Sequence, residues 1–222
     1  MHMNDLALFP TEKDVRDYIN GADFNVCDKW QKMVKEEAHL LMTWSGVSAK
    51  LLISNKRTAA YPCGVVGVNR TQLDRLFGTF TGAKYRTAVF FALSHEFGHL
   101  SQFSVFGVKS TFNRKRILVE AHADVLAGVW LAVRLLEGRV HKPNDVMDAG
   151  LKLKNNCADY PTGFQRGVLV QTGMQNAAIL GMLEKQITDS DYRSIRKALQ
   201  RQDVTDLYGT ARRKLQITPD NP

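Results

Sequence analysis

The segment from about Lys84 to Phe103 constrains the fold more than any other part of the chain. Its residues are apolar on most faces of a helix, which is typical of a helix buried at the centre of a domain. A second apolar helix is predicted over about residues 114–137 and ends at Gly138. The chain is therefore expected to fold around buried helices.

The rest of the chain predicts further helices and a small sheet. Apolar residues at helical spacing predict helices over about 12–19, 26–44, 70–76, 144–155, 163–186 and 191–200, with a loop over 104–113. Strands are predicted over 49–54 and 59–69, and Pro62 with two glycines places the second strand at a sheet edge or in an irregular region. These elements predict an α+β fold that is mainly α.

The length of the chain fits one domain. Its 222 residues contain no Pro-, Gly- or Ser-rich linker that would divide them into two halves. A hydrophobic fraction of 44% excludes a wholly disordered or fibrous chain. We expect a single domain over 1–222, with a core over about 25–187 and a polar C-terminal tail over about 203–222.

Hydropathy and cysteine usage point to a cytoplasmic protein. No window offers a charge-free run near 18 residues, so neither a signal peptide nor a membrane span is expected. The cysteines, Cys27, Cys63 and Cys157, are scattered and odd in number, which argues against a disulfide framework and favours reduced thiols.

The charge is unusual, because 30 Lys and Arg residues face 22 Asp and Glu residues and leave a formal net charge of +8. Residues 61–120 carry 8 basic and 3 acidic side chains, so the excess is concentrated there. Such a segment is compatible with a solvated basic face, with an acidic partner or with nucleic acid. No recognised nucleic-acid motif supports direct binding of nucleic acid.

The first apolar helix contains the run His95-Glu96-Phe97-Gly98-His99. Residues four apart lie one turn apart on the same helix face, so His95 and His99 can bind one metal ion together. Glu96 lies beside the first histidine, where its carboxylate can face a metal-bound water. The alternative is a helix with two satisfied core histidines and a paired glutamate. Because glutamate is almost never buried without a strong partner, a Zn²⁺ site explains the run better.

The second apolar helix supplies a third ligand in the run Glu120-Ala121-His122-Ala123-Asp124. A catalytic zinc site needs three protein ligands and leaves the fourth position for water. We assign Glu120 as the third ligand, with Asp124 accepting a hydrogen bond from the other ring nitrogen of a ligand histidine. His122 or Asp124 as the third ligand is the alternative. Gln102 and Val105 stand where another zincin branch has a glycine and a histidine.

These two helices resemble the bacterial putative neutral zinc metallopeptidase family, which is similar to the thermolysin-like gluzincins. The resemblance rests on the runs 93–102 and 120–130 and extends over about residues 59–175. It implies a zincin-like domain with a small edge sheet and two buried metal-ligand helices. The chain departs from the family in lacking a hydrophobic N-terminal segment and in carrying Tyr160 where members have a histidine.

The resemblance also implies roles for residues outside the two helices. Tyr160 would donate a hydrogen bond to the oxyanion, and Arg166 would orient its loop or a carboxylate near the site. The strand Gly64–Asn69 would be the substrate-side edge strand, on which a peptide pairs with the backbone of Gly64, Val65, Val66 and Gly67.

We therefore predict a zinc-dependent endopeptidase in which Glu96 takes a proton from a zinc-bound water and delivers it to the leaving amine. Its expected partner is a peptide or protein substrate, with an acidic or nucleic-acid-associated one as a weaker preference. Two alternatives remain. One is a peptidase-like module that binds proteins and uses zinc only as a structural staple, and the other is a basic nucleic-acid-associated regulator.

Overall fold

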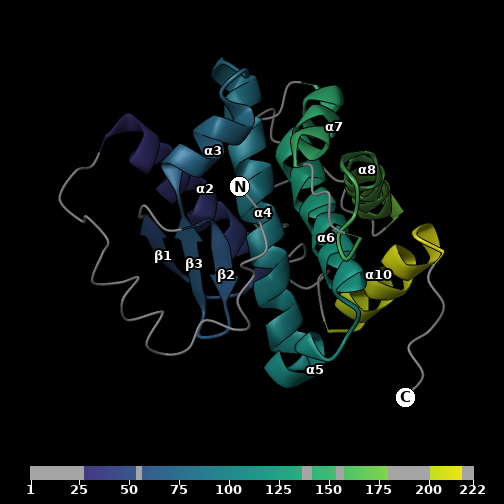
Figure 1. Cartoon of the computed structure of the whole chain (residues 1–222). Coiled ribbons are helices and arrows are strands. Elements are labelled where there is room, and N and C mark those ends of the chain that lie inside the picture. The colour runs from purple at the N-terminus through teal and green to yellow at the C-terminus, as the bar shows by residue number, and fades with distance from the viewer. Residues whose placement is uncertain (1–27, 54–56, 137–141, 154–157, 180–200, 217–222) are drawn as a thin grey trace.

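The computed structural model describes residues 28–53, 57–136, 142–153, 158–179 and 201–216. It is mainly helical with one small mixed sheet, so the predicted α+β, mainly α class is confirmed. Figure 1 shows the sheet on one side of the long helix α4 and the helices α6, α7, α8 and α10 on the other. The elements are α2 (Lys29–Ser45), β1 (Lys50–Ile53), β2 (Ala59–Tyr61), β3 (Val65–Val68), α3 (Arg70–Phe77), α4 (Gly82–Phe106), α5 (Val108–Phe112), α6 (Arg116–Leu136), α7 (Pro143–Lys152), α8 (Gly163–Ile179) and α10 (Arg201–Lys214).

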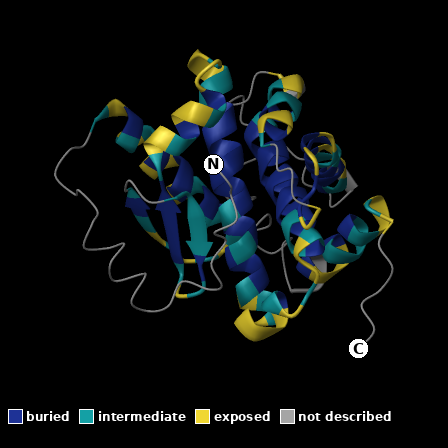
Figure 2. Cartoon of the chain, in the orientation of Figure 1, coloured by how far each residue is buried: buried dark blue, intermediate teal, exposed yellow. Residues whose placement is uncertain are grey.

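The two helices predicted to be buried, α4 and α6, form the centre of the molecule. Most of both helices is dark blue in Figure 2, which marks buried residues. On α4 the buried side chains include Phe90, Phe91 and Phe97, and on α6 they include Trp130. Their burial in one hydrophobic core holds the two helices together along their length.

The sheet corrects the prediction of one strand over 59–69. The chain turns between β2 and β3, where the N–H of Gly64 donates to the Tyr61 carbonyl at 3.0 Å. Gly64 has a φ of 77°, a left-handed conformation that glycine adopts without steric cost. Pro62 and Gly64 were therefore the signals of a turn between two strands.

The predicted edge strand lies in the centre of the sheet, so its assignment as the substrate-binding edge is wrong. The strand order is β1-β3-β2, with β1 parallel and β2 antiparallel to β3. Val65, Val66 and Gly67 are buried and paired on both sides, which leaves no free edge for a peptide. A continuous apolar run such as Val-Val-Gly-Val is typical of a strand covered on both faces. The edge strand next to α4 is β2.

The C-terminal region and one loop also differ from the prediction. Residues 203–214 of the expected polar tail belong to the helix α10, whose Val204, Leu207 and Ala211 are buried at helical spacing. The loop predicted over 104–113 contains the short helix α5. The helices predicted over 12–19 and 191–200, the end of the helix predicted over 163–186, and Cys27 and Cys157 lie outside the described residues.

Among the helices in the described ranges, none combines the length and the hydropathy that crossing a membrane requires. Cys63, the cysteine that falls within those ranges, is exposed and forms no disulfide bond.

Candidate metal centre

The close packing of α4 against α6 brings the two predicted motifs together. Gly98, in the middle of the first motif, lies against Ala123 of the second. A Cβ atom at position 98 would stand only 2.9 Å from the Cα atom of Ala123, so a larger residue would push the helices apart. Gly98 therefore allows a side chain on α6 to reach the two histidines on α4.

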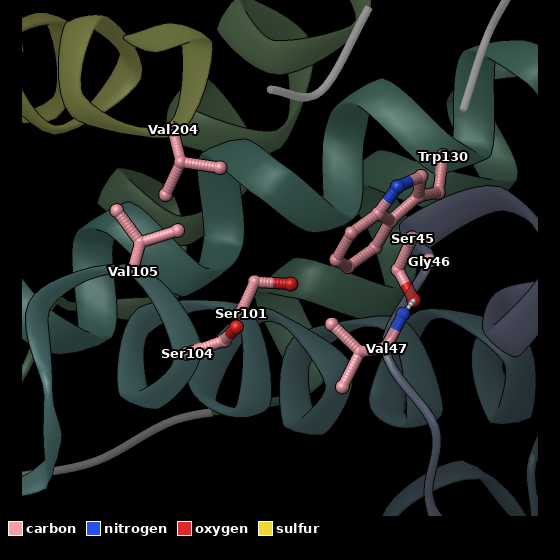
Figure 3. A pocket seen from close by; sticks show the side chains of 8 residues that line it. All are labelled: Ser45, Gly46, Val47, Ser101, Ser104, Val105, Trp130 and Val204. Atoms are coloured by element: carbon pink, nitrogen blue, oxygen red, sulfur yellow. Dashed lines mark hydrogen bonds between the residues drawn. The ribbon is translucent and has the colours of Figure 1, made fainter. Parts of the chain in front are cut away.

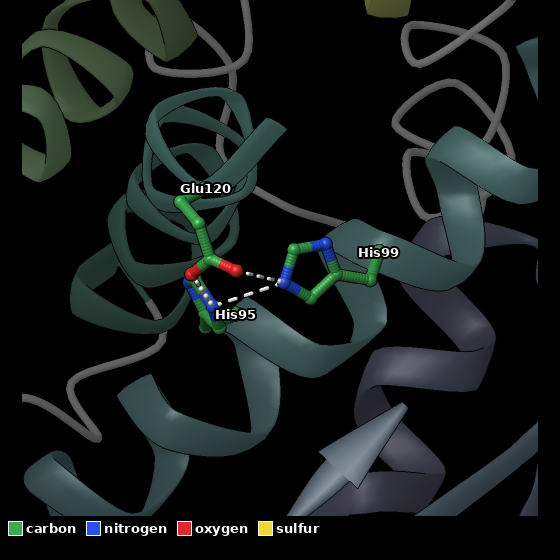
Figure 4. A group of neighbouring side chains, drawn as sticks. All are labelled: His95, His99 and Glu120. Carbon is green, nitrogen blue, oxygen red and sulfur yellow. Dashed lines mark hydrogen bonds and ion pairs between the residues drawn. The ribbon is translucent and has the colours of Figure 1, made fainter. Parts of the chain in front are cut away.

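His95, His99 and Glu120 form a group that could hold a metal ion. Figure 4 shows the three side chains pointing toward one another from α4 and α6. The Nε2 atoms of His95 and His99 are 3.1 Å apart. The carboxylate oxygens of Glu120 lie 3.3 Å from His95 Nε2 and 3.7 Å from His99 Nε2. The predicted ligand set is thus brought together in space.

Asp124 lies where the sequence predicted a partner for a ligand histidine. Its Oδ1 atom is 2.8 Å from Nδ1 of His95, and its side chain is fully buried. When His95 Nδ1 carries the hydrogen, the carboxylate accepts it and Nε2 keeps its lone pair for a metal ion. Asp124 therefore orients His95 and is not among the three ligand atoms.

Arg166 contacts both acidic residues of α6, an arrangement that agrees with its predicted role in orienting a carboxylate near the site. Its Nη1 atom donates to the two carboxylate oxygens of Asp124 at 2.9 and 3.0 Å. Its Nη2 atom donates to Glu120 at 3.2 Å, and the residue is only 5% exposed. A paired guanidinium of this kind fixes the position of both carboxylates.

The charges of this group shift the pKa values in the protein without metal. Burial works to lower the pKa of His95, but the charge and hydrogen bond of Asp124, together with Glu120, raise it to about 10. Burial works to raise the pKa of Glu120, but its hydrogen bond with His95 and the positive charges nearby hold it well below its usual range. His95 must therefore lose a proton when it binds a metal ion.

Glu96 lies one residue after the first ligand and faces the sheet. Its Oε2 atom accepts a hydrogen bond from the N–H of Ala60 on the edge strand β2 at 2.7 Å. Since this N–H points to Glu96, it points away from β3, and the Ala60 carbonyl lies on the same outer side. The predicted general base is thus fixed at the outer edge of β2, with which no further strand pairs among the described residues.

Tyr160 is buried and lies close to the start of α6. The guanidinium of Arg116 is 5.0 Å from the centre of the Tyr160 ring, and Arg116 is one turn before Glu120 on the same helix. The role of Tyr160 as an oxyanion donor stays a prediction.

Sequence reasoning missed Gln102, and it gave His122 no role apart from that of an alternative ligand. Gln102 Oε1 lies 2.9 Å from His99 Nδ1, and Gln102 Nε2 lies 3.2 Å from His122 Nδ1. Burial lowers the pKa of His122 to about 3. Gln102 is three residues after His99, and this helical spacing was the signal that could have revealed it.

The basic excess of residues 61–120 is partly neutralised by acids from elsewhere in the chain. Arg70 pairs with Asp28, Lys84 with Asp148, and Arg86 with Glu36 and Glu37. These pairs reduce the positive charge that the segment presents to solvent.

Gly128 on α6 and Gly173 on α8 lie in close contact, which positions α8 and its Arg166 next to the site. This contact leads to a prediction for Gly173→Ala. The new Cβ atom would lie 2.0 Å from the Val125 carbonyl oxygen and 2.9 Å from the Cα atom of Gly128. Because α8 would have to move, we expect a loss of about 1–3 kcal/mol in unfolding free energy and weaker metal binding. Chemical denaturation and metal titration measure the two effects.

Gly209→Ala on α10 is the matched control for this prediction. Its Cβ atom would meet only the end of the flexible Arg213 side chain at 3.5 Å. We expect this change to raise the unfolding free energy by about 0.5–1 kcal/mol, as alanine usually does inside a helix. Equal effects of both substitutions would contradict the close-contact explanation.

The residues gathered here can hold one metal ion, fix two of its ligands through Asp124 and Arg166, and place a carboxylate at the outer edge of β2. This combination is suited to metal-assisted hydrolysis of a bound chain. Comparisons of the sequence and structure with protein-family models, curated proteins and solved structures found no match.

Proposed function

We propose that the protein is a zinc-dependent endopeptidase of the gluzincin type. The observation that carries the proposal is the spacing of the ligand atoms of His95, His99 and Glu120. Three ligands at about 2.0–2.1 Å from a tetrahedral zinc ion stand about 3.3 Å apart. In this group the Nε2 atoms of the two histidines are 3.1 Å apart, Glu120 Oε2 is 3.3 Å from His95 Nε2, and the other oxygen, Glu120 Oε1, is 3.7 Å from His99 Nε2. Taken as one ligand atom from each residue, the three atoms all lie within 4.8 Å of one another. Two imidazoles and one carboxylate are also the donor set of known catalytic zinc sites.

A zinc ion bound by these residues would supply a Lewis acid that lowers the pKa of water to about 7 and polarises the scissile carbonyl. Glu96 would take the proton of the attacking water at its carboxylate and return it to the nitrogen of the leaving amine. Its hydrogen bond from Ala60 holds the carboxylate in one orientation during both transfers. Asp124 and Arg166 would keep His95 and Glu120 in place.

The proposed path of the peptide follows β2 instead of β3. The outer side of Ala60 presents its carbonyl to a peptide N–H, and an extended peptide can pair with a strand edge in this way. A peptide on this edge passes Glu96, because Glu96 contacts the same residue. Tyr160 remains the proposed oxyanion donor, supported by its contact with Arg116 near Glu120.

Metal content and metal-dependent hydrolysis test the proposal. The purified protein is expected to contain about one equivalent of zinc and to cleave an unfolded, fluorescence-quenched protein substrate. Chelation should stop cleavage and added zinc should restore it. Circular dichroism before and after chelation distinguishes loss of zinc from loss of fold. A protein with well under one equivalent of zinc, or cleavage that persists after the zinc is removed, would contradict the proposal.

A further inference from the structure

Gln102 of α4 is almost completely buried beside the metal centre, with 1% of its surface exposed. All the polar atoms of its amide have partners. Its Oε1 atom is 2.9 Å from His99 Nδ1, and its Nε2 atom is 2.7 Å from the Val119 carbonyl and 3.2 Å from His122 Nδ1. Val119 immediately precedes Glu120. One amide thus connects a histidine of α4 to the turn of α6 that carries the acidic ligand.

The Val119 carbonyl determines the orientation of the Gln102 side-chain amide. A carbonyl oxygen can only accept a hydrogen bond, so the atom at 2.7 Å from it must be the NH₂ group of Gln102. The amide oxygen then faces His99, and it can only accept. His99 Nδ1 must therefore carry the hydrogen, which leaves Nε2 with a lone pair directed at His95 and Glu120.

His122 completes the arrangement on the side away from the metal centre. Its Nδ1 atom accepts the second N–H of the Gln102 amide. The His122 ring is itself fixed by edge-on packing against Tyr208 of α10, with ring centres 5.4 Å apart. The amide therefore cannot rotate away without losing hydrogen bonds to three groups, and it cannot exchange its oxygen and nitrogen without losing the one to the Val119 carbonyl.

We propose that Gln102 is a positioning residue that holds His99 in the tautomer required for binding the metal, with His122 fixing the amide from behind. The two ligand histidines then have different partners, because His95 has the carboxylate of Asp124 and His99 has a neutral amide. The inference rests on the metal centre of the proposed function and is independent of hydrolysis. Removal of such an outer partner weakens metal binding by about 10- to 100-fold.

Zinc dissociation constants, measured by competition with a coloured chelator, test this role in two variants at position 102. Gln102→Met keeps the length of the side chain and removes the acceptor, so we expect zinc binding about 10- to 100-fold weaker than wild type. Gln102→Glu restores an oxygen for the His99 N–H and should bind zinc at least about ten-fold more tightly than Gln102→Met. Equal weakening in both variants, or wild-type affinity in Gln102→Met, would overturn the proposal.

Ser101→Ala is the matched control on the same turn of α4. Ser101 is also buried, but it points about 200° away from His99, because successive helical residues differ by about 100°. It lines a cavity of about 250 Å³ together with Trp130 and Val204, on another side of the helix (Figure 3). Ser101→Ala should bind zinc as wild type does. A loss as large as that of Gln102→Met would show a general disturbance of α4 and overturn the proposal.

Nitrogen-15 NMR of the imidazole rings in the zinc-loaded wild type provides a measurement that needs no variant. His99 is expected to carry its hydrogen on Nδ1, and a hydrogen on Nε2 would overturn the proposal even if the variants fail to fold. Failure of the proposed function is seen separately. A wild-type protein that binds no zinc removes the metal centre, whereas zinc bound without hydrolysis leaves the role of Gln102 intact.

Discussion

Glu96→Gln is expected to lower peptide hydrolysis by about 10²- to 10⁴-fold while zinc remains bound. A glutamine side chain cannot take a proton from water, so the proton transfer proposed for Glu96 is lost. Its amide oxygen can still accept the hydrogen bond from the Ala60 N–H, which Glu96 accepts at 2.7 Å. Glu96 is also not among the three clustered ligand atoms. Initial rates of cleavage and the zinc content of the same sample measure the two expectations.

The outcomes of this experiment distinguish the competing functions. Since the backbone hydrogen bond is kept, the unfolding free energy of Glu96→Gln should stay within about 1 kcal/mol of wild type. Unchanged hydrolysis with zinc intact would exclude Glu96 as the general base. If neither the wild type nor Glu96→Gln cleaves a substrate, but both retain zinc and the same activity in the cell, the zinc has a structural role in a protein-binding module. Loss of zinc in the variant would instead show that Glu96 helps to bind the metal.

The group of His95, His99 and Glu120 was predictable from the sequence, because most of its geometry is set within single helices. Helical periodicity places His95 and His99 on one face of α4, and the same rule places Glu120 and Asp124 on one face of α6. The apolar neighbours of both runs showed that the helices are buried, and two buried helices with ionisable residues are expected to meet. A glycine at position 98 indicates a close helix contact, but the sequence could not show that Gly98 meets Ala123, the register that brings Glu120 within reach of the histidines.

The edge strand could not be predicted because strand order is a property of the folded chain. The run Val65–Val68 fits a strand, but nothing local states whether one or two neighbours pair with it. In the folded chain, β3 lies between β1 and β2, because the chain turns at Gly64 and pairs β3 with β2. The outer edge beside Glu96 therefore belongs to β2. Gln102 was missed for a related reason, because its partners Val119 and His122 are distant in sequence.

A buried cluster of charged side chains between α2, α4 and α6 is expected to contribute strongly to the unfolding free energy. The Oε1 atom of Glu37 accepts hydrogen bonds from Arg134 Nη2 and from Arg86 Nε, both at 2.5 Å. The Glu37 side chain is fully buried and that of Arg134 is 1% exposed, whereas that of Arg86 is 39% exposed. The charge of Arg134 is therefore tolerated inside the core because a carboxylate accompanies it.

Glu37→Leu is expected to lower the unfolding free energy by about 3–5 kcal/mol, because it withdraws the carboxylate from a guanidinium that stays in the core. The double variant Glu37→Leu/Arg134→Met should recover most of this loss, since buried ion pairs can often be replaced by apolar residues at little cost. Urea denaturation at a fixed zinc concentration measures both.

Glu36→Gln is the control for this prediction, because the Glu36 side chain is 49% exposed and lies 3.3 Å from the same Arg86. We expect it to change stability by less than about 1 kcal/mol, as exposed ion pairs usually do. If Glu37→Leu were as mild as Glu36→Gln, burial of the cluster would not explain its stability. A double variant no more stable than Glu37→Leu would show that the carboxylate does more than neutralise Arg134. In the first of these cases the junction of α2 with α4 would depend on apolar packing, such as that of Trp44 against Phe90, whose ring centres lie 5.9 Å apart.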